Sequence, residues 1–363
     1  MTSTTTAAEV FPPGDYLRDE LEERGWTGTE FAEIIGRPVQ AVSEILNGKK
    51  EVTAETAIAF AEALGTSPEL WLNLQMNYKL HQARRATHGG LTPIERRSRL
   101  RGLVPLSKVT RRGWLRDTKD LDQLEELVRE FLDVANLDDR PSFVHAAKRS
   151  NSSQPLQTEQ VAWLARVRQI ARNKPTDEAF DLAGTRDLAA RLPKLTAAGT
   201  SALTQVPAWF AQHGVVVVFV EGLPGGKLDG AVTSLSDGGP VIGLTACGDR
   251  FDIVLFTLLH ELAHLTLGHI TPQTQTMVDT DVVGDQVDSI EREANDQAKA
   301  WLFPDGFEPE AVSAKDLERI AARYGVHRSV IIGQIQRHTG NWGWQRSRIP
   351  KVRADLSEAG LLA

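Results

Sequence analysis

One segment, residues 250–267, constrains the fold of this chain more than any other. Most of its side chains are apolar, yet it contains the run His260-Glu261-Leu262-Ala263-His264. Apolar residues at helical spacing predict a buried helix, which ends at Gly268. Polar side chains are buried only when something pairs with them, so the two histidines and the glutamate need a function in this helix.

The spacing of the two histidines indicates a metal site. Four residues turn a helix about 40° beyond one revolution, so His260 and His264 project from one face and can bind one ion. Glu261 points in an adjacent direction, where it reaches a water molecule at the metal rather than the metal itself. Zinc lowers the pKa of such a water to about 7, and a carboxylate can take its proton and pass it to a leaving amine. The pattern predicts a mononuclear zinc hydrolase with Glu261 as catalytic base. The alternative is a buried histidine pair that bonds to backbone carbonyls.

A third protein ligand is expected, because catalytic zinc sites have three protein ligands and one open position. Two acidic residues, Glu291 and Glu293, lie on a predicted helix, which fixes a ligand better than a loop does. They point about 200° apart, so only one can face the metal. The apolar stripe of this helix slightly favours Glu291. The other downstream candidates are Asp279, Asp281, Asp285 and Asp288.

The segments HELAHLTLGH (260–269), EREANDQAKAWLFP (291–304) and GVHRSVIIGQIQRH (325–338) resemble the ImmA/IrrE family of metallopeptidases. The resemblance covers about residues 215–338 and implies a zincin-like fold with Zn²⁺ as cofactor. It also implies that the glutamate directly before Ala-Asn, Glu293, is the third ligand. This implication outweighs the apolar stripe of the helix, which favours Glu291.

Two further residues are candidates for a role beside the metal. His269 follows the helix end, so the chain can bend back and bring it near the cleft as an oxyanion donor or as support for a ligand. Asn295 can orient a ligand imidazole. The alternatives are a surface histidine and a solvated amide.

The N-terminal part has short helical patterns with clear capping signals. Thr27 and Glu30 form a capping box, Gly36 ends that helix, and Thr53 caps a later one. The segments PPGDYLRDELEERGW, TGTEFAEIIG, VQAVSEILNGKK and TSPELWLNLQ resemble the Xre-type helix-turn-helix of HigA-like antitoxins. The resemblance implies a DNA-binding domain at residues 11–85.

One helix of this domain has side chains suited to reading DNA. Gln40, Ser43 and Asn47 lie off its apolar face and can reach base edges, while Lys49 and Lys50 suit phosphates. However, residues 1–85 carry thirteen acidic against eight basic residues, which is unfavourable for phosphate binding. The alternative is a domain for protein docking or dimerisation.

Basic residues are concentrated between the two recognisable domains. From Arg84 to Arg116 there are ten basic residues and one acidic residue, and glycines and prolines interrupt the stretch, so a linker is expected. A contact with phosphates is an equally simple interpretation. Further on, a β-branched run at 215–220 and two shorter runs at 231–235 and 241–244 predict strands.

The predicted fold class is multidomain. An all-α helix-turn-helix domain is followed by a helical region and an α+β zincin-like metallopeptidase domain with a small β-sheet. The expected boundaries are 11–85 for the helix-turn-helix domain, 86–116 for the basic linker, 117–205 for the helical region, 206–340 for the metallopeptidase domain and 341–363 for an irregular tail.

Composition excludes several classes of protein. Hydrophobic residues make up 41% and charged residues 25% of the chain, as in soluble globular proteins. A single cysteine, Cys247, excludes an internal disulfide and a structural zinc finger. The sequence has neither a secretion signal nor an apolar run of about 18 residues, so we expect a cytoplasmic protein that does not contact membranes.

Together these patterns predict a cytoplasmic zinc-dependent endopeptidase that binds DNA as a homodimer. By analogy with the family, its substrate is an Xre-type repressor or antitoxin-like protein, and cleavage controls transcription. One alternative is a non-proteolytic transcriptional regulator whose metallopeptidase-like domain senses a ligand or metal. Another is an antitoxin that binds a partner toxin, which a small toxin gene beside this one would favour.

Overall fold

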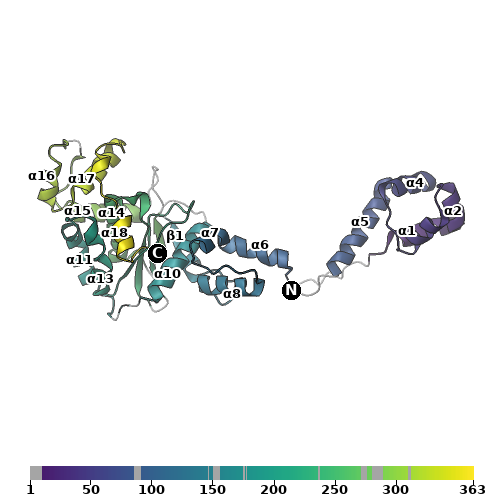
Figure 1. Cartoon of the computed structure of the whole chain (residues 1–363), viewed down its shortest axis with the longest axis horizontal. Coiled ribbons are helices and arrows are strands. Elements are labelled where there is room, and N and C mark those ends of the chain that lie inside the picture. The colour runs from purple at the N-terminus through teal and green to yellow at the C-terminus, as the bar shows by residue number, and fades with distance from the viewer. Residues whose placement is uncertain are drawn as a thin grey trace. The chain divides into compact units, whose positions relative to one another are not determined.

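The chain folds into two units, Met1–Ile94 (unit 1) and Glu95–Ala363 (unit 2), and Figure 1 shows the elements of each. The structure is a computed structural model. It describes residues 10–85, 91–145, 147–149, 156–174, 176, 178–235, 238–270, 276–279, 289–309 and 312–363.

Unit 1 is made of helices whose ends follow from their own residues. Thr27 Oγ1 accepts a hydrogen bond from the Glu30 amide at 3.2 Å, and Glu30 Oε2 accepts one from the Thr27 amide at 2.7 Å, so the predicted capping box is confirmed. Gly36 has a φ of 65°, which ends the same helix, and Thr53 caps a later one as predicted. The helices are α1 (Pro13–Arg24), α2 (Gly28–Ile34), α3 (Val39–Leu46), α4 (Ala54–Leu64) and α5 (Pro68–Arg85).

Three aromatic rings hold the core of unit 1 together. Phe60 lies 5.2 Å from both Phe31 and Trp71, measured between ring centroids, and all three side chains are buried. Leu17, Val42 and other apolar residues of the helices complete this core.

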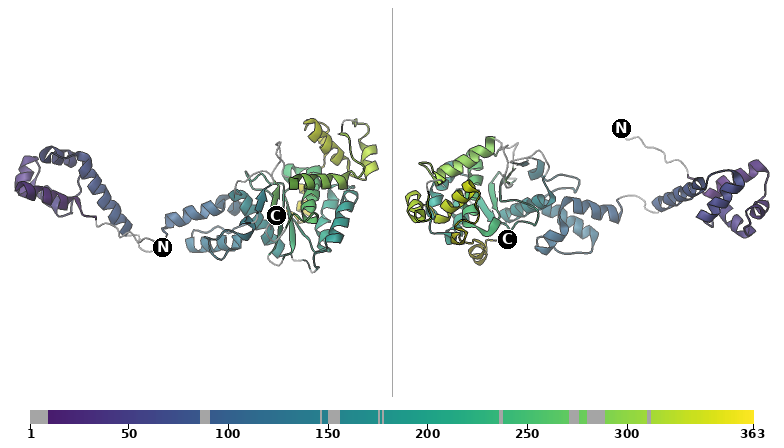
Figure 2. Two further views of the ribbon diagram at one scale, coloured as in Figure 1. Left: turned by 180° about the vertical axis from the view of Figure 1, so that it is seen from behind. Right: turned by 90° about the horizontal axis from the view of Figure 1, so that it is seen from above.

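Unit 2 combines helices with one mixed sheet (Figure 2). The strands are β1 (Ala147–Arg149), β2 (Val216–Phe219), β3 (Gly230–Ser234), β4 (Pro240–Leu244) and β5 (Thr276–Asp279), in the order β1-β5-β3-β4-β2. β3 is antiparallel to both β4 and β5, while β1–β5 and β2–β4 are parallel pairs. The helices are α6 (Pro93–Leu103), α7 (Leu106–Arg111), α8 (Leu121–Leu132), α9 (Ser142–His145), α10 (Thr158–Arg172), α11 (Leu182–Leu195), α12 (Thr200–Leu203), α13 (Val206–Ala211), α14 (Phe251–Thr266), α15 (Ser289–Leu302), α16 (Leu317–Tyr324), α17 (Arg328–Thr339) and α18 (Arg353–Glu358).

Both faces of the sheet are buried, which explains the nearly continuous apolar run of β2. Val216 and Val218 face a core that includes residues of α8 and α10, whereas Val217 and Phe219 face a second core that contains α14. α10 contacts β2 and β4, and α14 contacts β3 and β4. The helix with the histidines is therefore fixed against the middle of the sheet.

The last residues of the chain extend the edge of the sheet beyond β2. Leu362 forms a parallel bridge with Phe219, the amide of Glu221 donates to the carbonyl of Ala363 at 2.8 Å, and the amide of Ala363 donates to the carbonyl of Phe219 at 3.1 Å. The predicted irregular tail at 341–363 is thus partly wrong. It contains α18, and its buried Val352 and Leu356 belong to the α14 core.

The predicted linker at 86–116 is also wrong over most of its length. From Pro93 onward the chain forms α6 and α7, whose Leu100 and Val109 are fully buried in unit 2. Part of the basic excess serves ion pairing with other elements: Arg96 pairs with Asp122 and Glu125 of α8, and Lys108 pairs with Glu159.

The described helices include none that is both long enough and apolar enough to cross a membrane. The three strands predicted from β-branched runs are confirmed as β2, β3 and β4, whereas β1 and β5 were not predicted.

Candidate metal centre and DNA-binding helix

The helix α14 places two histidines on one buried face, as its sequence predicts. Several of its apolar residues, among them Leu255, Leu258 and Leu262, are fully buried between the sheet and neighbouring helices. His260 and His264 lie about one helical turn apart, and both are buried.

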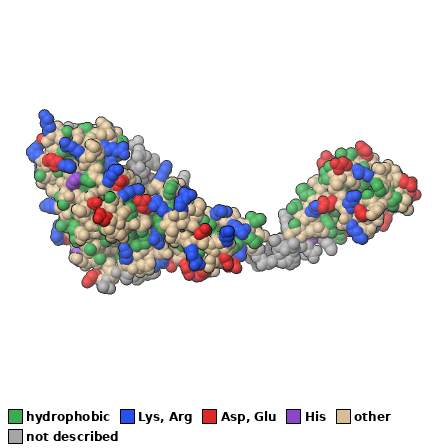
Figure 3. Space-filling model, in the orientation of Figure 1, with side chains coloured by type: hydrophobic (Ala, Val, Ile, Leu, Met, Phe, Trp, Pro, Cys, Tyr) green, Lys and Arg blue, Asp and Glu red, His purple; other side chains and the backbone are tan. Residues whose placement is uncertain are grey.

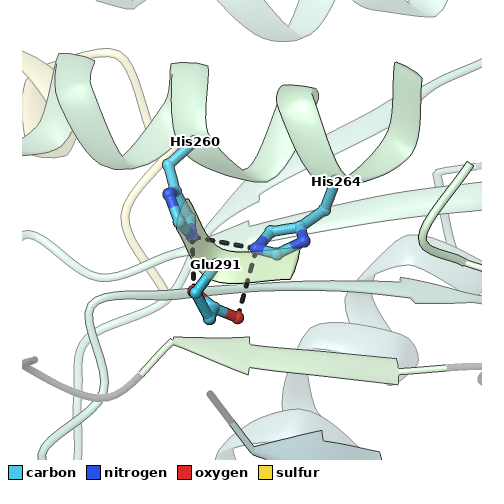
Figure 4. A group of neighbouring side chains, drawn as sticks. All are labelled: His260, His264 and Glu291. Atoms are coloured by element: carbon cyan, nitrogen blue, oxygen red, sulfur yellow. Dashed lines mark hydrogen bonds and ion pairs between the residues drawn. The ribbon is translucent and has the colours of Figure 1, made fainter. Parts of the chain in front are cut away.

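A third side chain, Glu291 of α15, meets the two histidines (Figure 4). Its Oε2 lies 3.2 Å from Nε2 of His260, and its Oε1 lies 3.4 Å from Nε2 of His264. The two Nε2 atoms lie 2.9 Å apart. All three side chains are 2% exposed, so α14 and α15 bring three ligand-type groups together inside the protein.

These distances fit the spacing between ligand atoms around a zinc ion. With zinc–nitrogen and zinc–oxygen bonds of about 2.0–2.1 Å, two ligand atoms of a tetrahedral site lie about 3.3 Å apart. The two nitrogen–oxygen distances are close to this value, and the nitrogen–nitrogen distance is somewhat shorter. Two imidazoles with one carboxylate are also a common set in catalytic zinc sites.

The electrostatics of His264 and Glu291 favour the protonation states that a metal needs. Burial lowers the pKa of His264, so its imidazole is neutral in ordinary buffers. Burial alone would raise the pKa of Glu291, but hydrogen bonds and charge interactions with His260 and His264 outweigh it and lower this pKa to about 2. Neutral imidazoles and an ionised carboxylate are the forms that bind cations.

Glu261 lies beside this cluster in a space that a glycine leaves open. Its side chain is fully buried. A Cβ atom on Gly230, the first residue of β3, would lie 2.7 Å from Oε1 of Glu261 and 2.7 Å from Cγ2 of Thr257. This role of Gly230 was not predicted from the sequence, although a glycine at the start of a strand is a signal of close approach.

The predicted third ligand, Glu293, does not join the cluster, and this prediction is corrected by the structure. Its side chain is 67% exposed, and its Oε2 contacts Nε2 of His269 at 3.2 Å. The physical reason is the rotation of α15: once Glu291 faces the histidines, a residue two positions later points away. The apolar stripe of the helix was the better signal.

The other predicted residues around the centre are placed as follows. His269 is next to His264, with their Nδ1 atoms 2.9 Å apart. Asn295 lines a pocket of about 430 Å³ that is also lined by His260. Asp279 is the last residue of β5. Asp281, Asp285 and Asp288 lie outside the described residues. The sequence did not single out Asp229, Phe256, Arg337 and Trp342, which also line the pocket.

In unit 1, α3 exposes the predicted DNA-contacting residues together. Gln40, Ser43 and Asn47 are exposed on the side opposite the buried Val42 and Ile45. Two of these side chains form hydrogen bonds with neighbouring residues of the helix. Gln40 Nε2 donates to Glu44 Oε1 at 3.1 Å, and Asn47 Nδ2 donates to the Ser43 carbonyl at 2.7 Å.

Charge is mixed around this helix. Lys49 and Lys50 are exposed just after α3. The space-filling view in Figure 3 shows both acidic and basic side chains on the visible face of unit 1.

Comparison with known families assigns a domain in each unit. Residues 17–71 match the profile of the helix-turn-helix, and residues 211–333 match that of the IrrE N-terminal-like domain. The uncharacterized HTH-type transcriptional regulator YddM of Escherichia coli K12 is 37% identical over 71 residues, which are 20% of this chain and 76% of the regulator. The chain belongs to the helix-turn-helix family. Its first unit is thus a helix-turn-helix DNA-binding domain, and its second contains an IrrE-like domain of a metallopeptidase family.

Further relatives resemble only a small part of the chain. Antitoxin HigA-1 of Vibrio cholerae is 44% identical over 63 residues, which are 17% of this chain and 59% of the antitoxin, less than two thirds of its length. The structure of a HigA-family addiction module antidote protein from Coxiella burnetii is 33% identical, covers 24% of this chain and 99% of that protein, and has a TM-score of 0.22.

Proposed function

We propose that this chain is a zinc-dependent endopeptidase that also binds DNA through its helix-turn-helix domain. The buried cluster of His260, His264 and Glu291 supports this proposal most strongly, because burying three such groups is costly unless they bind something. Glu261 lies on the same helix as the two histidines and supplies the base that hydrolysis needs. The IrrE-like domain belongs to a metallopeptidase family, which agrees with this chemistry.

The residues divide the work as follows. His260 and His264 would hold the ion through Nε2, and Glu291 would hold it through its carboxylate. When bound, zinc polarises the substrate carbonyl and lowers the pKa of a water molecule. Glu261 takes up the proton of the attacking water and donates it to the leaving amine. Gly230 keeps space for the Glu261 carboxylate, and the packing of α14 against the sheet keeps that carboxylate out of bulk water.

The substrate class that we propose is a repressor or antitoxin-like protein. The helix-turn-helix domain supports it, because a chain bound at an operator meets the regulators that bind there. Cleavage of such a client would relieve repression.

Glu261→Gln tests catalysis separately from metal binding. The amide keeps the shape of the side chain but cannot accept a proton, so cleavage of the client should fall by about 10² to 10⁴, while zinc content stays at the wild-type level. The measurements are proteolysis of purified repressors from the same genome and induction of the regulated promoter. Normal induction by this variant, with zinc bound, would contradict the peptidase and support a regulator that senses metal or a ligand.

The choice of third ligand has its own test. Glu291→Ala should lose the ion, whereas Glu293→Ala should still bind one ion per chain. Zinc at about 100 times its dissociation constant should stabilise the wild-type fold by about 2.7 kcal/mol, and Glu291→Ala should lose this gain. Metal analysis and thermal melting with and without a chelator measure both. Loss of stoichiometric zinc in Glu293→Ala but not in Glu291→Ala would restore the choice made from the resemblance.

We also propose that Gln40, Ser43 and Asn47 read DNA, with Lys49 and Lys50 at phosphates. A homodimer would then bind two half-sites about 10 bp apart. Genome-wide occupancy should show reproducible palindromic sites, and Gln40→Ala combined with Ser43→Ala should abolish them. Occupancy that this double variant leaves unchanged would mean that Gln40 and Ser43 do not read DNA. It would favour a domain for protein docking, and the antitoxin hypothesis is one form of that alternative.

A further inference from the structure

A line of contacts leads from the metal cluster to the surface through His264. Its Nε2 faces Glu291, at 3.4 Å, whereas its Nδ1 lies 2.9 Å from Nδ1 of His269. Nε2 of His269 in turn lies 3.2 Å from Oε2 of Glu293. The exposed fraction of the side chain rises along this line from 2% at His264 to 8% at His269 and 67% at Glu293.

The end of α14 builds the first of these contacts. Gly268 has a φ of 77°, its amide donates to the carbonyl of Leu265 at 3.3 Å, and the amide of His269 donates to the carbonyl of His264 at 3.0 Å. This is the Schellman arrangement that commonly ends a helix. It folds the chain back, so the imidazoles of His264 and His269 lie at a centroid distance of 5.1 Å. Glu293 comes from α15, which packs along α14.

The hydrogen bonds along this line can point in only one consistent way once His264 binds a metal. Nε2 of His264 must then present its lone pair, so its proton is on Nδ1 and is donated to Nδ1 of His269. The proton of His269 is therefore on Nε2, where the carboxylate of Glu293 accepts it. Every donor in the line faces an acceptor.

We propose that His269 and Glu293 are positioning residues for the metal ligand His264. They hold its ring orientation and its tautomer, and the negative charge of Glu293 makes His264 a better electron-pair donor through His269. The proposal rests on the metal centre of the proposed function. Partners of this kind typically change metal affinity by about 10- to 100-fold.

The test is the zinc affinity of the full-length protein, measured by competition with a chromophoric chelator. His269→Phe keeps a ring of similar size without hydrogen bonds and should weaken zinc binding by about 10- to 100-fold. Glu293→Gln should weaken it less, because the amide oxygen still accepts a hydrogen bond. Asp296→Asn is the matched control: it removes the same charge from the exposed side of α15, where Asp296 contacts Lys299, and should have no effect.

A double variant distinguishes action through His269 from a direct effect on the ion. In the His269→Phe background, Glu293→Gln should add no further loss, because its connection to His264 is already broken. If Glu293→Gln lowered the zinc affinity by the same factor with and without His269, Glu293 would act directly on the ion. This result would overturn the proposal. His269→Gln should restore part of the affinity, since its amide can both accept and donate.

Spectroscopy supplies a readout that a purely structural role would not move. In the zinc-loaded protein, ¹⁵N NMR should place the His264 proton on Nδ1, and His269→Phe should make that proton exchange faster. Wild-type affinity in folded His269→Phe and Glu293→Gln would overturn the proposal while leaving the peptidase intact. A wild-type protein that binds no zinc would overturn the metal centre and this inference together. Zinc binding without proteolysis would contradict only the proposed activity.

Discussion

At the scale of single residues, two glutamates on α15 have opposite environments. Glu291 is buried between two histidines and has its pKa lowered to about 2, whereas the side chain of Glu293 is 67% exposed and meets one imidazole. Residues two positions apart on a helix point about 200° from each other, so the same type of side chain meets two different environments here. Position on the helix, and not residue type, decides which carboxylate can hold a cation.

Gly230 gives a prediction at the same scale. In Gly230→Ala the new methyl group would lie 2.7 Å from Oε1 of Glu261, so the carboxylate or β3 must shift. We expect a loss of about 1–3 kcal/mol in the free energy of unfolding, with unchanged zinc stoichiometry and reduced peptide cleavage. Urea unfolding, metal analysis and a proteolysis assay measure the three effects.

Gly222→Ala is the control for this substitution. Its nearest new contact, Cγ2 of Thr245, is at an ordinary distance of 3.6 Å, so stability and cleavage should stay close to wild type. If Gly230→Ala and Gly222→Ala had the same stability and the same cleavage rate, Gly230 would not set the position of Glu261.

At the scale of elements, α17 begins with an unusual cap. The capping residue is His327, whose Nδ1 accepts a hydrogen bond from the Ser329 amide at 3.2 Å. Only an unprotonated Nδ1 can accept it. Burial, followed by the positive charge of Arg328, lowers the pKa of His327, which agrees with this role.

This cap predicts a dependence of stability on pH. Because the pKa of His327 is lower in the folded state than its ordinary value of about 6.5, the contribution of the cap is fully present above about pH 6.5 and is lost as the pH falls through the folded-state pKa. The contribution should be about 1 kcal/mol. His327→Asn keeps a capping oxygen that does not titrate, so the difference in unfolding free energy between wild type and variant should change between about pH 8 and about pH 5. A difference that stays constant over this range would exclude the cap as a titrating group.

Elements whose limits are set by their own residues could be predicted from the sequence. The capping box of Thr27 and Glu30, the β-branched run of β2 and the apolar periodicity of α14 are local signals, and all three elements are confirmed. The pair of histidines on one face of α14 follows from helical geometry alone.

Features that depend on contacts between distant segments could not be predicted. β1 and β5 are strands of three and four residues that pair with each other from distant parts of the chain, and so short a segment has no clear periodicity. The basic stretch around Arg96 suggested a linker because its acidic partners lie on α8. The inward position of Glu291, by contrast, agrees with the apolar stripe of α15, and the error came from preferring the resemblance to that stripe.

At the scale of the whole molecule, the two units have separate cores. Phe31, Phe60 and Trp71 belong to the core of unit 1, whereas the cores on the two faces of the sheet belong to unit 2. We therefore predict that a loss of packing in one core affects the stability of its own unit.

Two core substitutions test this independence. Phe60→Ala should destabilise unit 1 by about 3–5 kcal/mol and abolish DNA binding, while zinc affinity stays at the wild-type value. Trp163→Ala removes a buried ring that donates to the Val220 carbonyl at 3.0 Å. It should destabilise unit 2 and lower the zinc affinity, while DNA binding stays at the wild-type level. Calorimetry should show that each variant shifts a different unfolding transition. A common shift of both transitions would mean that the units unfold as one.

The pairing of Leu362 and Ala363 with the end of β2 has a consequence for how molecules behave towards one another. An unpaired strand edge offers amide and carbonyl groups to a strand of another molecule and so promotes aggregation. These two residues occupy the groups of Phe219 and Glu221 that would otherwise be open. Deleting them should raise light scattering at high protein concentration, whereas Leu362→Val with Ala363→Ser, which keeps the backbone bonds, should not. If the shortened chain stays as monodisperse as the full one, the terminal pairing has no such protective effect.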